Sequence, residues 1–185
     1  MCIRDRKIRL TLEELDRDSF EKAVDAIVSA RKLYIIGVRS CAAMATFMSF
    51  YFNLIFDNVV KVSATTASEV FESLLRVGEG DVVIGVSFPR YSSRTVQAMN
   101  FARSRGATTI AITDSEVSPL SPISTYTLKA RSDMASFVDS LVAPLSLINA
   151  LLVAVSRKKN DDLANTFEDL EKIWEEYGVY EKVQE

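Results

Sequence analysis

The chain has 185 residues, of which 48% are hydrophobic and 25% charged, and this composition suits one globular domain with a sizeable buried core. Its formal net charge is −3, and because an acidic surface repels the phosphodiester backbone, we do not expect this segment to bind nucleic acid by itself. With two cysteines and no histidine, the chain lacks a disulfide framework, a cysteine cluster for a metal ion, and the side chain that most often serves as acid or base near neutral pH.

Short apolar runs alternate with helical patterns along the chain. The helical patterns cover residues 12–30, 40–56, 67–77, 92–105, 138–157 and 161–177. The predicted strands are 32–37, 58–63, 78–87 (which begins with a turn), 107–113 and 125–130, and loops fill 114–124 and 131–136. Residues 1–11 fit no element, so we expect a vestigial or disordered N-terminus before a single domain at 12–185.

Alternation of buried strands and helices is typical of repeated βαβ units. The pattern therefore predicts an α/β fold with a doubly wound, five-stranded parallel sheet in the order 2-1-3-4-5. Helices on both faces of the sheet would make it a three-layer structure. The last helix, 161–177, is acidic and amphipathic, and we expect it to pack on the domain through Phe167, Leu170, Ile173 and Trp174.

Two segments, 40–56 and 140–156, have no charged residue over 17 positions each. As helices they would be about 25 Å long, short of the roughly 30 Å hydrocarbon core of a bilayer, so we expect no membrane contact. Helices that are apolar on all sides are usually buried in a core or a subunit interface, which predicts a homodimer or homotetramer. The first residues given lack the charged, apolar and small-residue order of a signal peptide, so we expect a cytoplasmic location.

Polar residues cluster in two turns, each of which joins a predicted strand to the helix that follows it. The segment GVRSCAA (37–43) follows the first strand, and SFPRYSS (87–93) follows the third. In the predicted order these strands are neighbours, so both turns would open into one crevice at the carboxyl ends of the strands. The groups that could bind an anion there are the side chains of Arg39, Ser40, Ser87, Arg90, Ser92 and Ser93, together with two helix N-termini.

Each of these residues also has a structural interpretation. Ser92 or Ser93 could simply cap the helix that follows. Cys41, near a helix N-terminus, could line the ligand site or fill a small space in the core. Glu69 and Glu72 lie one helical turn apart and could reach a ligand from the end of the second strand, or could be solvated carboxylates on a helix face.

The motifs in this order resemble those of the sugar isomerase (SIS) domain, from about residue 20 to 157. The segments IIGVRSCAAMA and VSFPRYSSRTVQAM are most similar to the phosphosugar-binding domain of RpiR-type transcriptional regulators, in which an N-terminal helix-turn-helix domain precedes the SIS domain. The family pattern GxGxS falls on Gly37, Arg39 and Cys41, so that Arg replaces the second Gly and Cys the Ser. The pattern SxSGxT falls on Ser87, Pro89, Arg90 and Ser92, where the middle Ser-Gly is lost.

The resemblance implies a dimerising sensor of a phosphorylated sugar, or of a related small anionic metabolite, that takes part in regulating transcription of carbohydrate metabolism. DNA would be bound only through a helix-turn-helix domain, which we expect to be absent from this chain. An alternative is a phosphosugar aldose–ketose isomerase, which needs a base and an acid that resemble Glu and His in the family. A third interpretation is an interaction protein with an empty site. Because the chain has no His, we expect a non-catalytic domain without cofactor or metal.

Overall fold

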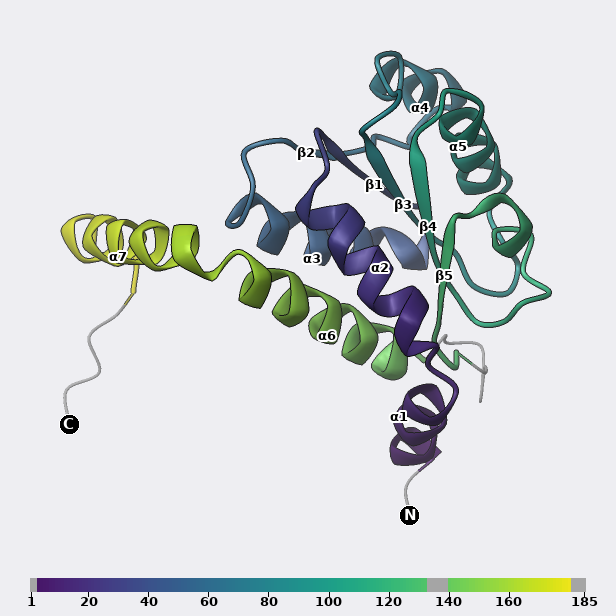
Figure 1. Cartoon of the computed structure of the whole chain (residues 1–185), viewed down its shortest axis with the longest axis horizontal. Coiled ribbons are helices and arrows are strands. Elements are labelled where there is room, and N and C mark those ends of the chain that lie inside the picture. Colours follow the sequence, from purple (N-terminus) through teal and green to yellow (C-terminus); the bar gives the residue numbers. More distant parts are fainter. Residues whose placement is uncertain (1–2, 133–139, 181–185) are drawn as a thin grey trace.

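The computed structural model describes residues 3–132 and 140–180, and these contain a five-stranded sheet and the helices around it (Figure 1). The strands are β1 Leu33–Gly37, β2 Val59–Lys61, β3 Val82–Val86, β4 Thr108–Thr113 and β5 Tyr126–Lys129. The helices are α1 Ile3–Glu13, α2 Arg17–Val28, α3 Ser40–Asn53, α4 Ala67–Ser73, α5 Ser93–Ser104, α6 Val142–Lys158 and α7 Asn160–Glu176, with a short 3₁₀ turn at Ser121–Ile123.

The sheet is parallel throughout, and its order β2-β1-β3-β4-β5 confirms the predicted topology. Strands β1 and β3 are buried along their whole length, because helices cover both faces of the sheet. Their register pairs Gly37, the last residue of β1, with Val86, the last residue of β3. Strands β1 and β3 therefore end side by side at the same edge of the sheet.

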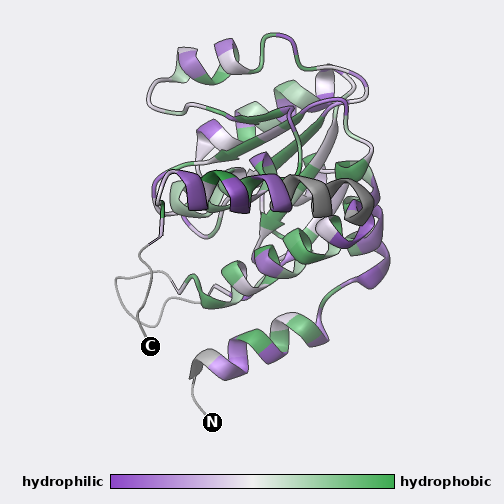
Figure 2. Ribbon diagram, turned by 90° about the vertical axis from the view of Figure 1, so that its left-hand side faces the viewer, coloured by the Kyte–Doolittle hydropathy of each residue, from purple (hydrophilic) through white to green (hydrophobic). Residues whose placement is uncertain are grey.

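Helices on opposite faces enclose two separate apolar clusters. The larger cluster joins α2, α3 and α6 to one face of the sheet, and the smaller joins α4 and α5 to the other. In Figure 2 the strands are predominantly hydrophobic, whereas several helices around them alternate between hydrophilic and hydrophobic segments. The predicted three-layer arrangement is confirmed, and α3 and α5 leave the adjacent strands β1 and β3 toward opposite faces.

The N-terminal part differs from the prediction. The helix expected at 12–30 corresponds to α2, whereas residues 12 and 13 end a separate helix, α1. The absence of secondary structure expected for residues 1–11 is wrong for the residues that form α1. The break falls at Asp16, whose extended backbone and carboxylate cap α2 by accepting hydrogen bonds from the amides of Asp18 and Ser19. The predicted loop at 131–136 lies mostly outside the described residues.

The last helix also differs. Helix α7 continues from the end of α6 and projects away from the sheet (Figure 1). The prediction that it packs on its own domain is wrong for Ile173, whose side chain is 48% exposed. The side chain of Phe167 lies outside the described residues.

The two uncharged segments form α3 and α6, which pack on each other and on the sheet. Both keep some large apolar side chains at the surface, among them Phe50, Tyr51 and Val153. Within the described ranges, no helix combines the length and hydropathy that crossing a membrane would need.

Candidate functional site

The candidate site lies between the turns that follow β1 and β3. A close approach of strand to helix fixes the first turn, because a Cβ on Gly37 would lie 2.4 Å from the carbonyl oxygen of Cys41. This is the position at which the family pattern GxGxS keeps its first glycine. Helix α3 begins at Ser40, immediately beyond the turn, and α5 begins at Ser93 after the second turn. Two helix N-termini thus face the same end of the sheet.

Arg39 and Arg90 both have a left-handed backbone. Their φ angles are 59° and 64°, and in the described part of the chain they are the residues other than glycine with positive φ. Such a conformation costs an L-residue roughly 1–2 kcal/mol relative to glycine. In the resemblance described above, both arginines fall on glycine positions of the patterns GxGxS and SxSGxT, and glycine is the residue that adopts positive φ without strain.

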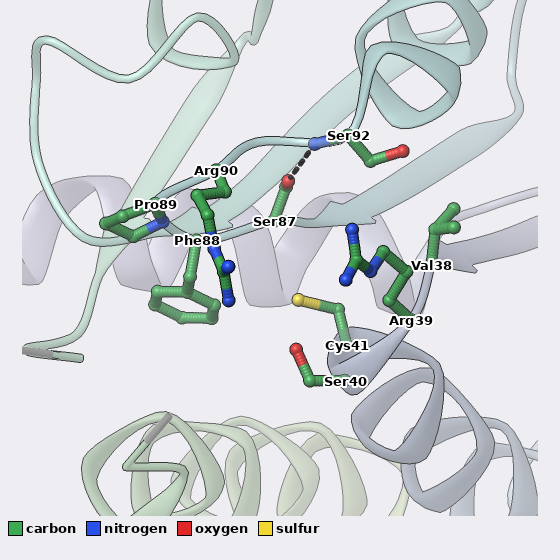
Figure 3. Close-up of a pocket in the computed structure, with 9 residues that line it drawn as sticks. All are labelled: Val38, Arg39, Ser40, Cys41, Ser87, Phe88, Pro89, Arg90 and Ser92. Carbon is green, nitrogen blue, oxygen red and sulfur yellow. Dashed lines mark hydrogen bonds between the residues drawn. The ribbon is translucent and has the colours of Figure 1, made fainter. Parts of the chain in front are cut away.

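These turns enclose a cavity of about 150 Å³ (Figure 3). Its lining consists of Val38, Arg39, Ser40, Cys41, Ser87, Phe88, Pro89, Arg90 and Ser92. Both guanidinium groups point into the space between the two turns. Across the described residues neither group has an ion-pair or hydrogen-bond partner, whereas Arg31 pairs with Asp81 and Arg131 with Glu14. Two unpaired cations in one small cavity create a strongly anion-attracting site.

The serines of the second turn form a local hydrogen-bond chain. Ser87 is 2% exposed, and its hydroxyl oxygen accepts a hydrogen bond of 3.1 Å from the amide of Ser92. Ser92 is the N-cap of α5, so the structural interpretation of this residue is confirmed, although it also lines the cavity. Ser93 is exposed and lies outside the lining. The hydroxyl proton of Ser87 is free to point toward a ligand, since the amide of Ser92 uses only the lone pair.

Tyr91 and Arg94 hold this turn in place without lining the cavity. The hydroxyl of Tyr91 donates a 2.8 Å hydrogen bond to Asp114 at the end of β4. Burial, and then this hydrogen bond, raise the pKa of Tyr91, so it stays a protonated donor. Arg94 donates to the carbonyl oxygens of Ala64 and Thr65, which ties α5 to the loop after β2. The sequence analysis missed both residues, because their partners lie far away along the chain.

A second cavity of about 340 Å³ adjoins the first and shares Val38 and Arg39 with it. Its other lining residues come from β1, α3, the end of β2 and the segment after it, namely Gly37, Ala42, Ala45, Thr46, Lys61, Val62, Ser63, Ala64 and Thr65. Lys61 donates to the hydroxyl of Thr46 across this space at 3.3 Å. The sequence signal for these residues was weak, since β2 is only three residues long and ends in ordinary polar residues.

The two carboxylates considered from the sequence line neither cavity. Glu69 completes a capping box with Thr66 at the start of α4, and its carboxylate accepts a 2.7 Å hydrogen bond from Ser63. That hydrogen bond lowers the pKa of Glu69. Glu72 is exposed on α4. The structure therefore gives Glu69 a local structural role and keeps Glu72 away from the site.

Comparison with known proteins places this arrangement in a family. A family model described as the SIS domain matches residues 26–154, well over half of the chain. An uncharacterised HTH-type transcriptional regulator of Caldanaerobacter subterraneus subsp. tengcongensis is 27% identical over 167 residues, which cover 88% of this chain and 58% of that regulator. Similar regulators from Haemophilus influenzae and Clostridium perfringens are covered to 51% and 54%. The chain thus spans little more than half the length of these relatives.

Solved structures show the same fold. The sugar isomerase domain of an RpiR transcription factor from Sphaerobacter thermophilus has a TM-score of 0.82 at 27% identity, covering 91% of this chain and 94% of that one. The NanR protein of Vibrio vulnificus, solved with ManNAc-6P, has a TM-score of 0.79 at 20% identity, covering 92% and 66%. Phosphoheptose isomerase of Neisseria gonorrhoeae has a TM-score of 0.70 at 15% identity, covering 82% and 93%. The resemblance to RpiR-type SIS domains is confirmed, and enzymes share the fold.

Proposed function

Because the chain belongs to the SIS domain family, we propose that it is the effector-binding domain of an RpiR-type transcriptional regulator and that its effector is a phosphosugar. DNA would be bound by a helix-turn-helix domain, in the part of such regulators that this chain does not span. The proposal is supported by similarity to HTH-type regulators and to an RpiR sugar isomerase domain. NanR, with the same fold, was solved with a phosphosugar bound.

One observation carries the anionic part of the proposal. Arg39 and Arg90 come from two different turns, line one cavity and have no partner among the described residues. A phosphate dianion would neutralise both guanidinium groups, and it would accept hydrogen bonds from them and from the hydroxyls of Ser40, Ser87 and Ser92. Cys41 would be a small lining residue, and Ser93 would contribute through its position at the start of α5.

The sizes of the two cavities suggest how the ligand lies. The smaller cavity, of about 150 Å³, is below the roughly 300 Å³ that small-molecule pockets usually have, whereas the adjoining one, of about 340 Å³, is within that range. The phosphate would occupy the smaller cavity between the two arginines. The sugar would extend past Arg39 into the larger cavity, toward Lys61, Thr46 and Ser63.

A sensor fits the lining better than an isomerase does. Moving a proton between adjacent carbons needs a poised base and usually an acid. The described lining of the two cavities holds no carboxylate, and the chain has no histidine. Isomerase activity remains the second candidate, because phosphosugar isomerases share the fold. Effector binding would instead act by a population shift, in which the ligand bridges both turns and repositions the helices that begin there.

The experiment is a thermal-shift titration with ManNAc-6P, arabinose 5-phosphate and other phosphosugars, each beside its unphosphorylated sugar. We expect stabilisation by at least one phosphosugar and none by its parent sugar. The response should be lost in Arg39→Ala and Arg90→Ala but kept in Arg76→Ala, which removes an exposed arginine elsewhere. No response to any phosphosugar, or an equal response in the two site variants, would contradict the proposal. Turnover of a ketose phosphate would favour the isomerase.

A further inference from the structure

The larger of the two adjoining cavities has hydrogen-bond donors in its wall at the end of β2. The ammonium group of Lys61 donates a hydrogen bond of 3.3 Å to the hydroxyl oxygen of Thr46, and both residues line the cavity. This bond uses a lone pair of the Thr46 oxygen and leaves the hydroxyl proton of Thr46 free to donate elsewhere. The ammonium group also carries further protons, so the two side chains together offer several donors to the cavity.

Lys61 is a cation without a carboxylate partner in the described part of the chain. Salt bridges to aspartate or glutamate are made instead by Lys22, Lys129, Lys158 and Lys172. The described lining of the two cavities contains no carboxylate. A phosphate dianion between Arg39 and Arg90 would balance the charge of the two guanidinium groups and leave the charge of Lys61 unbalanced.

Ser63 lies two residues after Lys61, lines the same cavity and has the opposite hydrogen-bonding character. Its hydroxyl donates to the carboxylate of Glu69 at 2.7 Å, so toward the cavity it can offer only lone pairs. This hydrogen bond lowers the pKa of Glu69, so the carboxylate stays ionised and keeps the proton of Ser63 engaged. Ser63 is therefore suited to accept a hydrogen bond from a hydroxyl group of the ligand.

Two backbone carbonyls in the same wall are already engaged. Arg94 donates to the carbonyl oxygens of Ala64 and Thr65, at 2.7 Å and 3.0 Å. These oxygens are correspondingly less available to a ligand. The side chains at this end of the cavity thus present a pair of donors, one of them charged, beside a single accepting hydroxyl. This arrangement matches a carboxylate that is next to a hydroxyl group.

We propose that the effector is a phosphorylated sugar acid, whose carboxylate binds Lys61 and Thr46 and whose adjacent hydroxyl group donates to Ser63. The inference rests on the proposed function, because it assumes that the phosphate lies between Arg39 and Arg90. Both oxygens of a carboxylate are acceptors, so one carboxylate can take hydrogen bonds from the ammonium group and from the Thr46 hydroxyl. The uncharged hydroxyl group of an ordinary phosphosugar would meet the same donors without balancing the charge.

Matched pairs of ligands test the proposal on the unaltered chain. Gluconate 6-phosphate and glucitol 6-phosphate differ in one group, which is a carboxylate in the first and a CH₂OH group in the second. Arabinonate 5-phosphate and arabitol 5-phosphate form the same pair with a chain one carbon shorter. Calorimetry should give a Kd about tenfold to hundredfold lower for the better-binding acid than for its alcohol, the effect of one charge-assisted hydrogen bond.

Variants of the wall then locate the preference. Lys61→Met removes the charge and keeps most of the stem, so it should raise the Kd of the acid to about that of the alcohol and leave the Kd of the alcohol unchanged. Thr46→Val should reduce the preference only in part, because the ammonium group remains. Lys22→Met is the matched control, since Lys22 is an exposed lysine on α2 outside the lining of both cavities, and it should keep the full preference. Circular dichroism would verify folding, which Lys61→Met should retain because Lys61 is exposed.

The outcomes separate this inference from the function on which it rests. If the alcohols bind as tightly as the acids and Arg39→Ala abolishes both, the phosphosugar site stands and the sugar-acid inference is overturned. A preference for the acid that persists in Lys61→Met also overturns it. Tighter binding of glucitol 1,6-bisphosphate than of either acid would assign the second anionic group to a phosphate and overturn the carboxylate. Binding of an uncharged sugar's phosphate without binding of either acid overturns the inference alone, whereas no binding by any phosphorylated compound overturns both.

Discussion

The left-handed arginines offer a direct test of whether the site sacrifices stability for binding. We consider Arg39→Gly and Arg90→Gly, each compared with the corresponding alanine variant. Glycine adopts positive φ without strain, whereas alanine keeps nearly the whole strain of the arginine. Both substitutions remove the guanidinium group. The pair of variants therefore separates the backbone effect from the loss of charge.

The expected stability change follows from two opposing effects. Relief of the left-handed backbone stabilises the folded state by roughly 1–2 kcal/mol at each position. The greater freedom of glycine in the unfolded chain offsets about 0.4–1 kcal/mol of this. The midpoints of the two ranges leave a net gain of about 0.8 kcal/mol, which corresponds to a rise in Tm of roughly 2–3 °C for a domain of this size. The alanine variants should melt close to the unaltered chain.

The same substitutions should weaken binding of the ligand. Loss of one charge-assisted hydrogen bond costs about 1.5–3 kcal/mol, or roughly a tenfold to hundredfold rise in Kd for the phosphosugar found by thermal shift. Glycine and alanine should weaken binding alike when it is measured by calorimetry. Arg76→Gly is the control, because Arg76 is outside the positive-φ residues and its replacement should lower Tm without affecting Kd.

The reasoning would be refuted by either of two results. Equal Tm values for the glycine and alanine variants would mean that the backbone strain is absent. Greater stability with unchanged Kd would mean that the arginines do not hold the ligand.

Two further predictions concern the scaffold. Asp81 is fully buried, and its carboxylate accepts hydrogen bonds from Arg31 and from the amide of Gly78. Asp81→Asn should therefore lower the free energy of unfolding, measured by urea titration, by about 2 kcal/mol. A loss under about 0.5 kcal/mol would contradict this expectation. The pKa of Glu69 lies below its usual value of 4.5 in the folded chain, so the stability supplied by its ionised form is complete above pH 4.5 and disappears as the pH falls through the lowered pKa. Glu69→Gln should therefore lose less Tm than the unaltered chain on acidification from pH 6 to pH 3, and parallel curves would show that the capping carboxylate contributes nothing.

Much of the fold follows from patterns that are local in the sequence. Apolar runs such as 32–37 and 82–86 can be recognised as strands, because both faces of a parallel sheet are covered and the strands are apolar throughout. Gly106 marks the end of the helix that precedes β4, where the backbone has a positive φ. The break between α1 and α2 was also signalled locally, by Asp16 as an N-cap, but the continuous helical spacing across it concealed the signal. The two turns of the site were found because polar residues directly follow buried strands.

Local patterns in the chain specify the strands, the helices, the two turns and the chemical groups that the turns carry, and the rule that places ligands at the carboxyl ends of parallel strands points to the site. What those groups can do depends on how the chain folds. The register of Gly37 against Val86 brought the turns to one level, the positive φ of Arg39 and Arg90 aimed two unpaired cations into one cavity, and the loop after β2 added a second cavity. The tertiary structure also decided that α7 leaves its own domain, because side-chain spacing predicts an apolar face but cannot tell which surface will cover it.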